Sequence, residues 1–550
     1  MRRVLPVLVL VSLWLIAAAP PPLAGRKGLV AAEHPLASQA GAEMLARGGN
    51  AADAIVAAAL AAGIVQPAGS GLGGGGFAVI YDGETGTSID FREVAPKGAS
   101  RDMFLDAKGE PVPNASVWGG LAVAVPAEGR GLAEIHKRFG KLPLKVIAEP
   151  AIRLSKGFAV GPHLAKAMAR SPDIAGLLFD GLTEAPKRGD VVRRARLGKT
   201  IAAWAKSGGT ALHEGPLADD IASAVQAAGG VLTAEDLAAY QTRERPVLRG
   251  TYRGYTILTM APPSSGGAVL LQVLGVLEGW DLKSLGHNSS EHVHLLAEAM
   301  KHAFADRAEL MGDPDFVEVP VERMLAPARI DAVRRAIYPS RTFPLDYYGT
   351  KVDPPRDAGT HHISVIDASG FAVSLTTTVN MPFGSKVVAP QSGILLNDQM
   401  DDFVVRPGVP NSFGLVGKES NAVAPGKRPL SSMTPTIVLD SQGRVVMVIG
   451  ASGGPTIISG TLQVLSNILD FGMDPEEAVS VPRMHHQWTP EKLMLDTGYP
   501  RDVQDALRAR GHVVEEMEFF NSVQVILIDP ETGLMTAASD PRKDGAPAAP

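Results

Sequence analysis

Residues Gly359–Asn380 read GTHHISVIDASGFAVSLTTTVN, and this stretch decides the fold expected for the chain. Apolar side chains occupy every second position on both sides of Asp367–Gly370, a sequence with turn chemistry. This pattern predicts two short strands joined by a tight turn. A hairpin centred on Ser369 sets Ile363 opposite Leu375, and the remaining pairs of the two strands follow from that register.

The same register sets Thr360 opposite Thr378, with cross-strand partners about 5 Å apart. Thr360 follows Gly359, and an unhindered glycine carbonyl beside a hydroxyl is what an intramolecular N-to-O acyl shift needs. Hydrolysis of the resulting ester would leave Thr360 as a new N-terminus. Its α-amine, with a reference pKa of about 7.7–8.0, could serve as general base for its own hydroxyl. A Gly-Thr pair entering a strand is also common without self-cleavage, so the surrounding sequence has to decide.

Five motifs follow one another along the chain: DFREVAP, the Thr-x-His-x-Ser run at Thr360, SGILLNDQMDDF, KRPLSSMTPT and ASGGP. With them the chain resembles the γ-glutamyltranspeptidase (glutathione hydrolase) family of N-terminal-nucleophile hydrolases, from GLVAAEHPLASQAG near the start to AASDPR at the end. The resemblance implies an α+β fold, the four-layer αββα sandwich, with a large helical portion in the N-terminal fragment. It also implies self-cleavage into a large subunit, residues 26–359, and a small catalytic subunit, residues 360–550. The two fragments would form one interleaved domain, a heterodimer made from one precursor.

The resemblance further implies a role for each of ten residues. The nucleophile would be Thr360, with its hydroxyl held by Thr378, and the oxyanion hole would be formed by Gly453 and Gly454. The substrate α-carboxylate would be bound by Arg92, Ser431 and Ser432. Its α-ammonium would be bound by Asn380, Gln399 and Asp402. These residue types suit the chemistry, because a guanidinium makes two parallel charge-assisted bonds to a carboxylate. Consecutive glycines at a strand-to-helix turn likewise expose backbone N–H groups to a developing oxyanion.

Residues Arg406–Lys427 are rich in proline and glycine and read as a loop. In lid-bearing bacterial members of the resembled family this segment covers the pocket. Many of them have a tyrosine where this chain has Phe413, and its hydroxyl bonds the asparagine equivalent to Asn380. Phenylalanine keeps the ring and lacks that bond, so we expect a lid at Phe413 that opens more readily.

Composition narrows the function classes. The chain has 550 residues, 45% hydrophobic and 20% charged, which predicts a large globular protein, and no linker or repeat divides it. The net charge of −6 gives no reason to expect nucleic acid or an anionic membrane surface as a partner. The absence of cysteine excludes disulfides, thiolate metal sites and a cysteine nucleophile.

The first residues have the pattern of an export signal. Arg2 and Arg3 precede an apolar run from Val4 to Ala19, which is shorter than the roughly 20 residues of a membrane span. We expect a signal peptide over residues 1–25, a periplasmic or secreted protein, and no stable membrane anchor. A retained anchor is the alternative.

Elsewhere the patterns predict scaffolding. Helices are expected from Leu36 to Arg47, from Asn50 to Val65 and at several places between Pro126 and Ile337, and a strand over Gly393–Leu396. The glycine-rich segment GSGLGGGGFAVIYDG follows a helix and enters a strand, the reverse of a dinucleotide-binding order, so we expect close backbone packing there. Adjacent histidines at His361-His362 and His485-His486 point to opposite faces of a strand, and we expect neither a metal nor a cofactor.

The function implied is hydrolysis of the γ-glutamyl amide of glutathione and related compounds through a γ-glutamyl-enzyme at Thr360. The acyl group would pass to water or to an amino-acid or peptide acceptor. Two alternatives remain. A cephalosporin acylase-like amidohydrolase needs Thr360 and the oxyanion hole and dispenses with the amino-acid clamp. A secreted binding protein that never matures would remain one chain.

Overall fold

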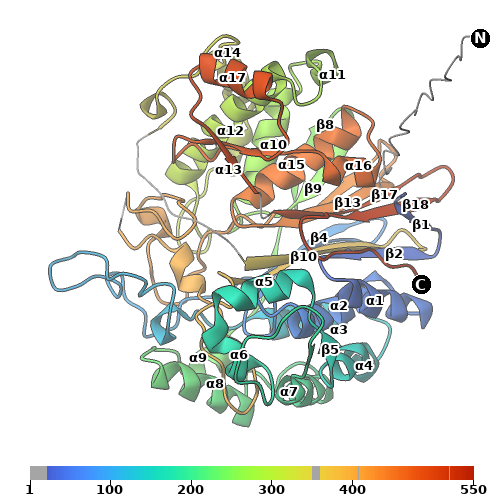
Figure 1. Ribbon diagram of the computed structural model, residues 1–550, viewed down its shortest axis with the longest axis vertical. Coiled ribbons are helices and arrows are strands. Elements are labelled where there is room, and N and C mark those ends of the chain that lie inside the picture. The colour runs from blue at the N-terminus through green and yellow to red at the C-terminus, as the bar shows by residue number, and fades with distance from the viewer. Residues whose placement is uncertain (1–20, 350–358, 407, 519–520) are drawn as a thin grey trace, which may run out of the picture.

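Two stacked β-sheets form the centre of the molecule, and helices cover the outer face of each (Figure 1). This computed structural model describes residues 21–349, 359–406, 408–518 and 521–550. The six-stranded sheet has the order β2-β10-β11-β3-β4-β7, and the seven-stranded sheet the order β1-β18-β17-β13-β12-β9-β8. The layers therefore run helix, sheet, sheet, helix, and the expected αββα arrangement is confirmed.

The six-stranded sheet draws on both sides of Gly359. Its strands are β2 (Gly28–Ala32), β3 (Gly75–Tyr81), β4 (Gly86–Phe91), β7 (Arg243–Arg245), β10 (Gly359–Asp367) and β11 (Ala372–Asn380). The seven-stranded sheet has β1 (Leu23–Gly25), β8 (Leu248–Tyr252), β9 (Tyr255–Thr259), β12 (Thr436–Leu439), β13 (Val445–Ser452), β17 (Ser522–Ile528) and β18 (Met535–Ser539). Three short strands, β14 (Met484–His485), β15 (Leu493–Asp496) and β16 (Val514–Met517), form a side sheet, and β5 (Phe158–Ala159) pairs with β6 (Val191–Val192).

The helices divide between the two outer faces. Below the six-stranded sheet lie α1 (Pro35–Ala46), α2 (Ala51–Val65), α3 (Glu128–Phe139), α4 (Leu144–Leu154), α5 (Pro162–Arg170), α6 (Ala175–Leu178), α7 (Ala195–Lys206), α8 (Pro216–Ala227) and α9 (Ala234–Ala239). Above the seven-stranded sheet lie α10 (Gly266–Leu277), α11 (Leu282–Leu285), α12 (Ser290–Leu310), α13 (Val321–Leu325), α14 (Pro327–Ala336), α15 (Thr456–Leu469), α16 (Pro475–Ser480) and α17 (Arg501–Ala509). The first two predicted helices are confirmed, and Asn50 caps α2 in a capping box with Asp53.

The central hairpin has the predicted register. Ile363 pairs with Leu375 and Thr360 with Thr378, and every residue of β10 and β11 is buried. Ile363 and Leu375 belong to the core that α2 closes. The alternate positions face the other sheet, where Ser364 Oγ donates to the Gln524 carbonyl of β17. Both faces of the hairpin are therefore packed, which fixes the strand that carries Thr360.

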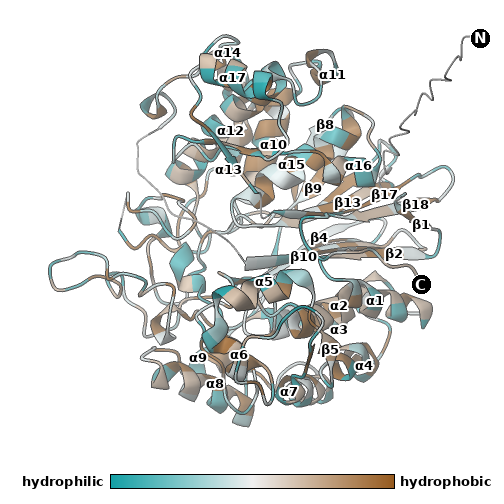
Figure 2. Cartoon of the chain, in the orientation of Figure 1, coloured by the Kyte–Doolittle hydropathy of each residue, from teal (hydrophilic) through white to brown (hydrophobic). Residues whose placement is uncertain are grey.

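Apolar packing continues between and above the sheets. Figure 2 shows β9 and β13 mostly in the apolar colours, and their side chains join those of α10, α12 and α15 in one cluster. The two sheets and their helices thus form a continuous frame, and the polar residues of the site lie where the strands of the two sheets end.

The expected strand over Gly393–Leu396 is wrong. Leu395 makes only an isolated bridge to Val388, and Leu396 N donates to the Val387 carbonyl over 2.9 Å. The segment folds back on the residues just before it instead of joining either sheet. Its apolar side chains are buried, and burial alone produced the strand-like pattern.

At the N-terminus, β1 pairs with β18, with Leu23 opposite Ala537 and Gly25 opposite Met535. The apolar run of the expected signal lies outside the described residues. A leader that ended at Gly25 would remove this edge strand from the sheet. Within the described residues, no helix combines the length and apolar character needed to cross a membrane.

Candidate active site

Three oxygen atoms at the start of β10 form a chain of hydrogen bonds. The Thr378 hydroxyl donates to the Gly359 carbonyl over 2.8 Å and accepts from the Asn380 N–H over 2.9 Å. Thr360 Oγ1 lies 3.1 Å from Thr378 Oγ1. Because a hydroxyl has one proton and Thr378 has given its own to Gly359, the Thr360 hydroxyl is the donor to Thr378. The nucleophile candidate, its partner and the carbonyl of the predicted cleavage site are thus directly connected.

The backbone packs closely around Gly359, the residue before Thr360. A Cβ atom at Gly359 would lie 2.5 Å from the Ala68 carbonyl oxygen and 2.9 Å from the Met381 carbonyl carbon. Both are backbone atoms, so the chain itself would have to move. The close packing therefore fixes the Gly359 backbone beside Thr378, whose hydroxyl donates to the Gly359 carbonyl.

The glycine-rich segment before β3 packs against the same site. A Cβ at Gly74 would lie 1.9 Å from the Thr378 carbonyl oxygen, and one at Gly73 the same distance from the Leu395 carbonyl oxygen. The prediction of close backbone packing is confirmed. These glycines let β3 and the loop before it lie directly against the strand that carries Thr378.

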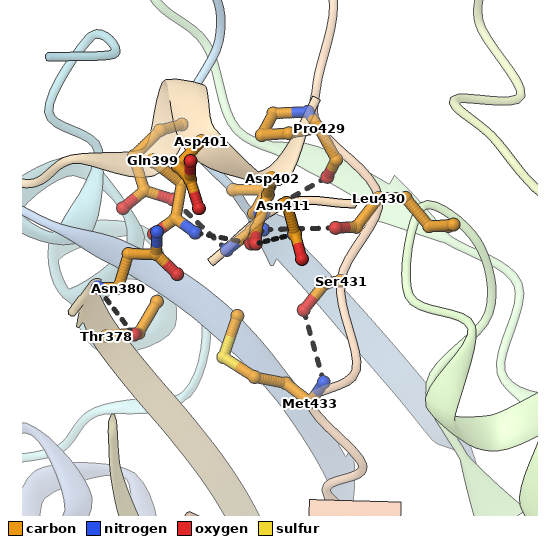
Figure 3. A network of polar contacts seen from close by, with 12 residues as sticks. Thr378, Asn380, Gln399, Asp401, Asp402, Asn411, Pro429, Leu430, Ser431 and Met433 are labelled. Carbon is orange, nitrogen blue, oxygen red and sulfur yellow. Dashed lines mark hydrogen bonds and ion pairs between the residues drawn. The ribbon is translucent and has the colours of Figure 1, made fainter. Parts of the chain in front are cut away.

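A buried ion pair lies next to the hydroxyls. Arg92 follows β4, is 1% exposed, and donates from Nη2 to Asp402 Oδ2 over 2.5 Å. Figure 3 shows Asp402 beside Gln399 and Asn411, which donate to the same carboxyl group. Arg92 Nε donates to the Pro429 carbonyl, and Gln399 Nε2 donates to the same oxygen of Asp402 over 2.7 Å. Burial raises the pKa of Asp402, and the positive charge of Arg92 opposes that rise. The sequence placed Arg92 and Asp402 at opposite ends of a ligand, whereas here they contact each other directly.

Glu93 adds a second acidic group behind Arg92. Its carboxylate lies 3.8 Å from Arg92 Nη1, and burial raises its pKa to about 7. Neither of its oxygens has a hydrogen-bond partner among the described residues. The Arg92 guanidinium is therefore balanced on both sides by carboxyl groups.

Nearly all predicted site residues line one small, buried cavity of about 20 Å³, close to the space of one water molecule. It is bounded by Arg92, Thr360, Thr378, Asn380, Gln399, Asp402, Phe413, Ser431, Ser432 and Gly454. Gln399 Oε1 and Ser432 Oγ have no partner among the described residues, although both are buried. An unpaired buried polar atom costs about 1–3 kcal/mol, so the cavity suits a ligand that supplies a donor to one and an acceptor to the other.

Gly453 and Gly454 occupy the turn between β13 and α15, as predicted. Gly454 lines the small cavity together with Thr360, while Gly453 accepts a hydrogen bond from Thr456 Oγ1 over 2.7 Å. The turn therefore brings Gly454 to the hydroxyl chain and holds Gly453 against the first residue of the helix.

The loop expected to act as a lid closes over the small cavity. The Phe413 ring lines it and is 8% exposed. Three bonds hold the tip: Asn411 Nδ2 donates to Asp402 Oδ1 over 3.3 Å, Ser412 N to Asp401 Oδ2, and Gln487 Nε2 to the Phe413 carbonyl. The Asn380 amide donates instead to the Asp398 carbonyl. The tip is thus attached without a hydroxyl at position 413.

A second and much larger cavity opens on the other side of Thr360. Its volume is about 950 Å³, and Gly359, Thr360, Trp118, Lys386 and Lys543 are among its lining residues. Thr360 therefore lines both a small cavity bounded mostly by buried residues and a much larger one that includes exposed residues.

Sequence reasoning missed several polar residues around Thr360. Asn411 on the lid tip, Asp398 below Asn380, and Lys543 beside the Thr360 carbonyl all make side-chain bonds at the site. The motif AASDPR ends at Arg542, so the family resemblance did not extend to Lys543.

Two histidines and a glutamate form a buried cluster of possible metal ligands. His294, Glu298 and His512 bring one ligand atom each within 4.8 Å of one another. Glu298 already accepts hydrogen bonds from Lys301, at 3.0 Å, and from the Thr342 hydroxyl, at 2.6 Å. His294 Nδ1 and His512 Nε2 already bond each other over 2.7 Å and Glu298 is paired with Lys301, so these residues form an internal polar network and do not fit a metal.

Comparison with known proteins gives consistent matches over the whole chain. The family model described as gamma-glutamyltranspeptidase matches residues 37–550. The glutathione hydrolase proenzyme of Escherichia coli is 41% identical over 532 residues, covering 95% of this chain and 91% of the relative. The glutathione hydrolase proenzyme of Pseudomonas aeruginosa is 40% identical and covers 94% of each chain.

Solved structures share the fold. Cephalosporin acylase from Bacillus halodurans superimposes with a TM-score of 0.86, at 29% identity, over 99% of both chains. The γ-glutamyltranspeptidase of Helicobacter pylori gives a TM-score of 0.55 at 37% identity, covering 60% of this chain and 94% of that one.

Proposed function

The chain belongs to the γ-glutamyltranspeptidase family, and we propose that it cleaves itself before Thr360 and then transfers γ-glutamyl groups from glutathione and related compounds. One observation carries the proposal. The hydroxyl chain from Thr360 through Thr378 to the Gly359 carbonyl borders the same small cavity as the Arg92–Asp402 pair. The reacting hydroxyl of Thr360 would therefore lie in the same cavity as the charges that recognise the amino-acid group.

Maturation begins with the peptide bond between Gly359 and Thr360. Thr360 Oγ1 attacks the Gly359 carbonyl carbon, while the Thr378 hydroxyl stabilises the negative charge that develops on the carbonyl oxygen. The proton that leaves the Thr360 hydroxyl passes to the amide nitrogen, the C–N bond breaks, and an ester joins Gly359 to Thr360. Water hydrolyses the ester and leaves the Gly359 carboxylate and a free α-amine on Thr360.

In the mature enzyme the free α-amine accepts the proton of the Thr360 hydroxyl, which attacks the γ-carbonyl of the substrate. The N–H of Gly454, on the turn beside Thr360, stabilises the tetrahedral oxyanion, with Gly453 positioning that turn. The leaving amine departs protonated, and a γ-glutamyl ester remains on Thr360. Attack by water gives glutamate, and attack by an amino-acid or peptide amine gives a new γ-glutamyl compound.

Recognition of the glutamyl head group falls to the residues around the small cavity, which must widen to admit it because about 20 Å³ holds only one water molecule. Arg92 with Ser431 and Ser432 binds the α-carboxylate, and Asp402 with Gln399 and Asn380 binds the α-ammonium. Since Arg92 and Asp402 now contact each other, the ligand must enter between them. The carboxylate of the ligand then pairs with Arg92, and its ammonium pairs with Asp402. Binding is therefore selective for a group that carries both charges.

The cephalosporin acylase likeness makes an amide hydrolase without an amino-acid clamp the second candidate. Two chromogenic anilides separate the candidates: γ-glutamyl-p-nitroanilide and glutaryl-p-nitroanilide, which differ only in the α-ammonium group. We expect kcat/KM to favour the γ-glutamyl compound by about 100-fold or more, because the glutaryl group leaves Asp402 unpaired. A preference for the glutaryl compound would assign the chain to the acylases.

We also propose that the processed pair is exported to the periplasm or secreted, after loss of a leader that ends before Leu23. The support is the Arg2-Arg3 start with its apolar run and the place of β1 in the sheet. N-terminal sequencing of the large fragment from the native host tests the boundary.

A further inference from the structure

Lys543 makes three hydrogen bonds beside the nucleophile. Its ammonium donates to Glu33 Oε2 over 2.8 Å, to the Thr360 carbonyl over 3.1 Å and to Ser452 Oγ over 2.6 Å. An ammonium has three N–H donors, so all of them are used. The side chain is only 6% exposed, and that of Glu33 is fully buried.

The three acceptors come from separate parts of the fold. Glu33 follows β2, Thr360 lies in β10 of the same sheet, and Ser452 ends β13 in the other sheet. Lys543 itself follows β18. One side chain thus ties the two sheets together at the end where Thr360 lies.

Two of the acceptors sit directly next to reacting groups. The Thr360 carbonyl belongs to the nucleophile residue, and Ser452 immediately precedes Gly453 and Gly454. The Lys543 ammonium therefore links the backbone of the nucleophile to the strand end from which the oxyanion-binding turn begins.

The charge of this ammonium is balanced locally. Glu33 also accepts from the His362 N–H over 3.1 Å, and His361 Nδ1 lies 3.8 Å from its other oxygen. Burial raises the pKa of Glu33, and Lys543 opposes that rise. Burial, together with the nearby Lys543 charge, lowers the pKa of His361 well below its usual value, so that ring is neutral at pH 7. The buried carboxylate of Glu33 is thus the partner of Lys543, and removing either one leaves the other charge uncompensated.

We propose that Lys543 is a positioning residue that holds the N-terminal threonine against the oxyanion-binding turn once the bond before Thr360 has been cut. This role rests on the proposed function. In the precursor, the covalent bond to Gly359 restrains the Thr360 backbone. Cleavage removes that restraint, and the bond from Lys543 to the Thr360 carbonyl remains, together with the strand ladder. A nucleophile displaced by about 1 Å can lose about 100-fold in rate, so such a tether has a measurable effect.

The test uses processed, purified enzyme and γ-glutamyl-p-nitroanilide in water without added acceptor. For Lys543→Met we expect kcat to fall about 10- to 100-fold while KM changes by less than about threefold, because the donor-binding cavity is intact. Lys543→Arg keeps the charge and can still donate to the carbonyl, so it should recover part of kcat. Lys145→Met is the matched control: Lys145 is an exposed residue of α4 that lines neither cavity, and the variant should match wild type.

Ser452→Ala provides a second variant in case Lys543→Met does not mature. It removes one of the three acceptors, leaves the Lys543–Glu33 pair intact, and should lower kcat about two- to tenfold, the effect of one hydrogen bond.

Two outcomes would overturn the proposal. Wild-type kcat in Lys543→Met, or in Ser452→Ala should the first variant stay unprocessed, shows that the ammonium does not position Thr360. A normal hydrolytic kcat combined with a raised KM for a dipeptide acceptor assigns Lys543 to acceptor binding instead. Failure of the proposed function is distinct, because the wild-type enzyme would then not release p-nitroaniline at all.

Discussion

The two cavities on either side of Thr360 differ in almost every respect. The small one, about 20 Å³, is bounded by a buried ion pair, amides and hydroxyls that bond to one another. The large one, about 950 Å³, includes the exposed Trp118 indole, which is 55% accessible. Fixed, paired charges demand one head group, whereas a large cavity with exposed side chains accepts many shapes. We therefore expect strict recognition of the donor and permissive recognition of leaving groups and acceptors.

The largest effect is expected from the strict side. Arg92→Ala leaves Asp402 buried without its cation, and losing one member of a buried pair typically costs about 3–5 kcal/mol. We expect kcat/KM for γ-glutamyl-p-nitroanilide to fall by the factor that corresponds to this free energy. Maturation should proceed, because Arg92 does not touch the Gly359 carbonyl. Steady-state kinetics of the processed variant measure the effect, and near-wild-type values would remove Arg92 from the site.

The hydroxyl chain comes next. Thr378→Val keeps the shape of the side chain and removes the donor to the Gly359 carbonyl. Loss of one oxyanion-stabilising donor costs about 10²–10³ in rate, so maturation should slow by that factor. Thr378→Ser keeps the hydroxyl and is the control. A gel time course of freshly translated precursor follows both, and equal cleavage rates would show that Thr378 takes no part in the acyl shift.

The closed lid should respond more weakly. Asn411→Ala removes the bond from the lid tip to Asp402, and one net hydrogen bond is worth about 0.5–1.5 kcal/mol. We expect a two- to tenfold rise in KM for the donor substrate and a larger hydrolysed fraction when a dipeptide acceptor is present. Phe413→Tyr should shift the same fraction in the opposite direction and by less, because three other bonds already hold the tip. Product partitioning at fixed acceptor concentration measures both variants. Identical partitioning in wild type and Asn411→Ala would show that the bond from Asn411 to Asp402 does not hold the lid closed.

The smallest effect should come from the permissive side. Trp118→Ala changes the wall of the large cavity without touching Thr360 or the ion pair. Hydrolysis of γ-glutamyl-p-nitroanilide should stay within about twofold of wild type, in the range of ordinary surface substitutions. A large loss of donor kcat/KM would contradict the division of labour between the two cavities.

Local sequence pattern predicted the hairpin down to its register, because alternation and a turn are properties of adjacent residues. It predicted which residues gather at Thr360 through motifs. It did not predict that Arg92 and Asp402 touch, since 310 residues separate them and no local pattern reports that distance. Lys543 escaped for the same reason, because its partners lie 91 to 510 residues away. The strand predicted over Gly393–Leu396 failed because burial in a loop and burial in a sheet give the same apolar run.

Self-cleavage at Gly359-Thr360 is the central claim, and intact-mass analysis of purified wild type and Thr360→Ala tests it most directly. We expect two fragments for wild type, the smaller one comprising residues 360–550 and beginning with Thr360, and one uncleaved chain for the variant, since a methyl group cannot carry out the acyl shift. A Thr360→Ala protein cleaved at the same bond, or a wild-type fragment beginning at another residue, would contradict it.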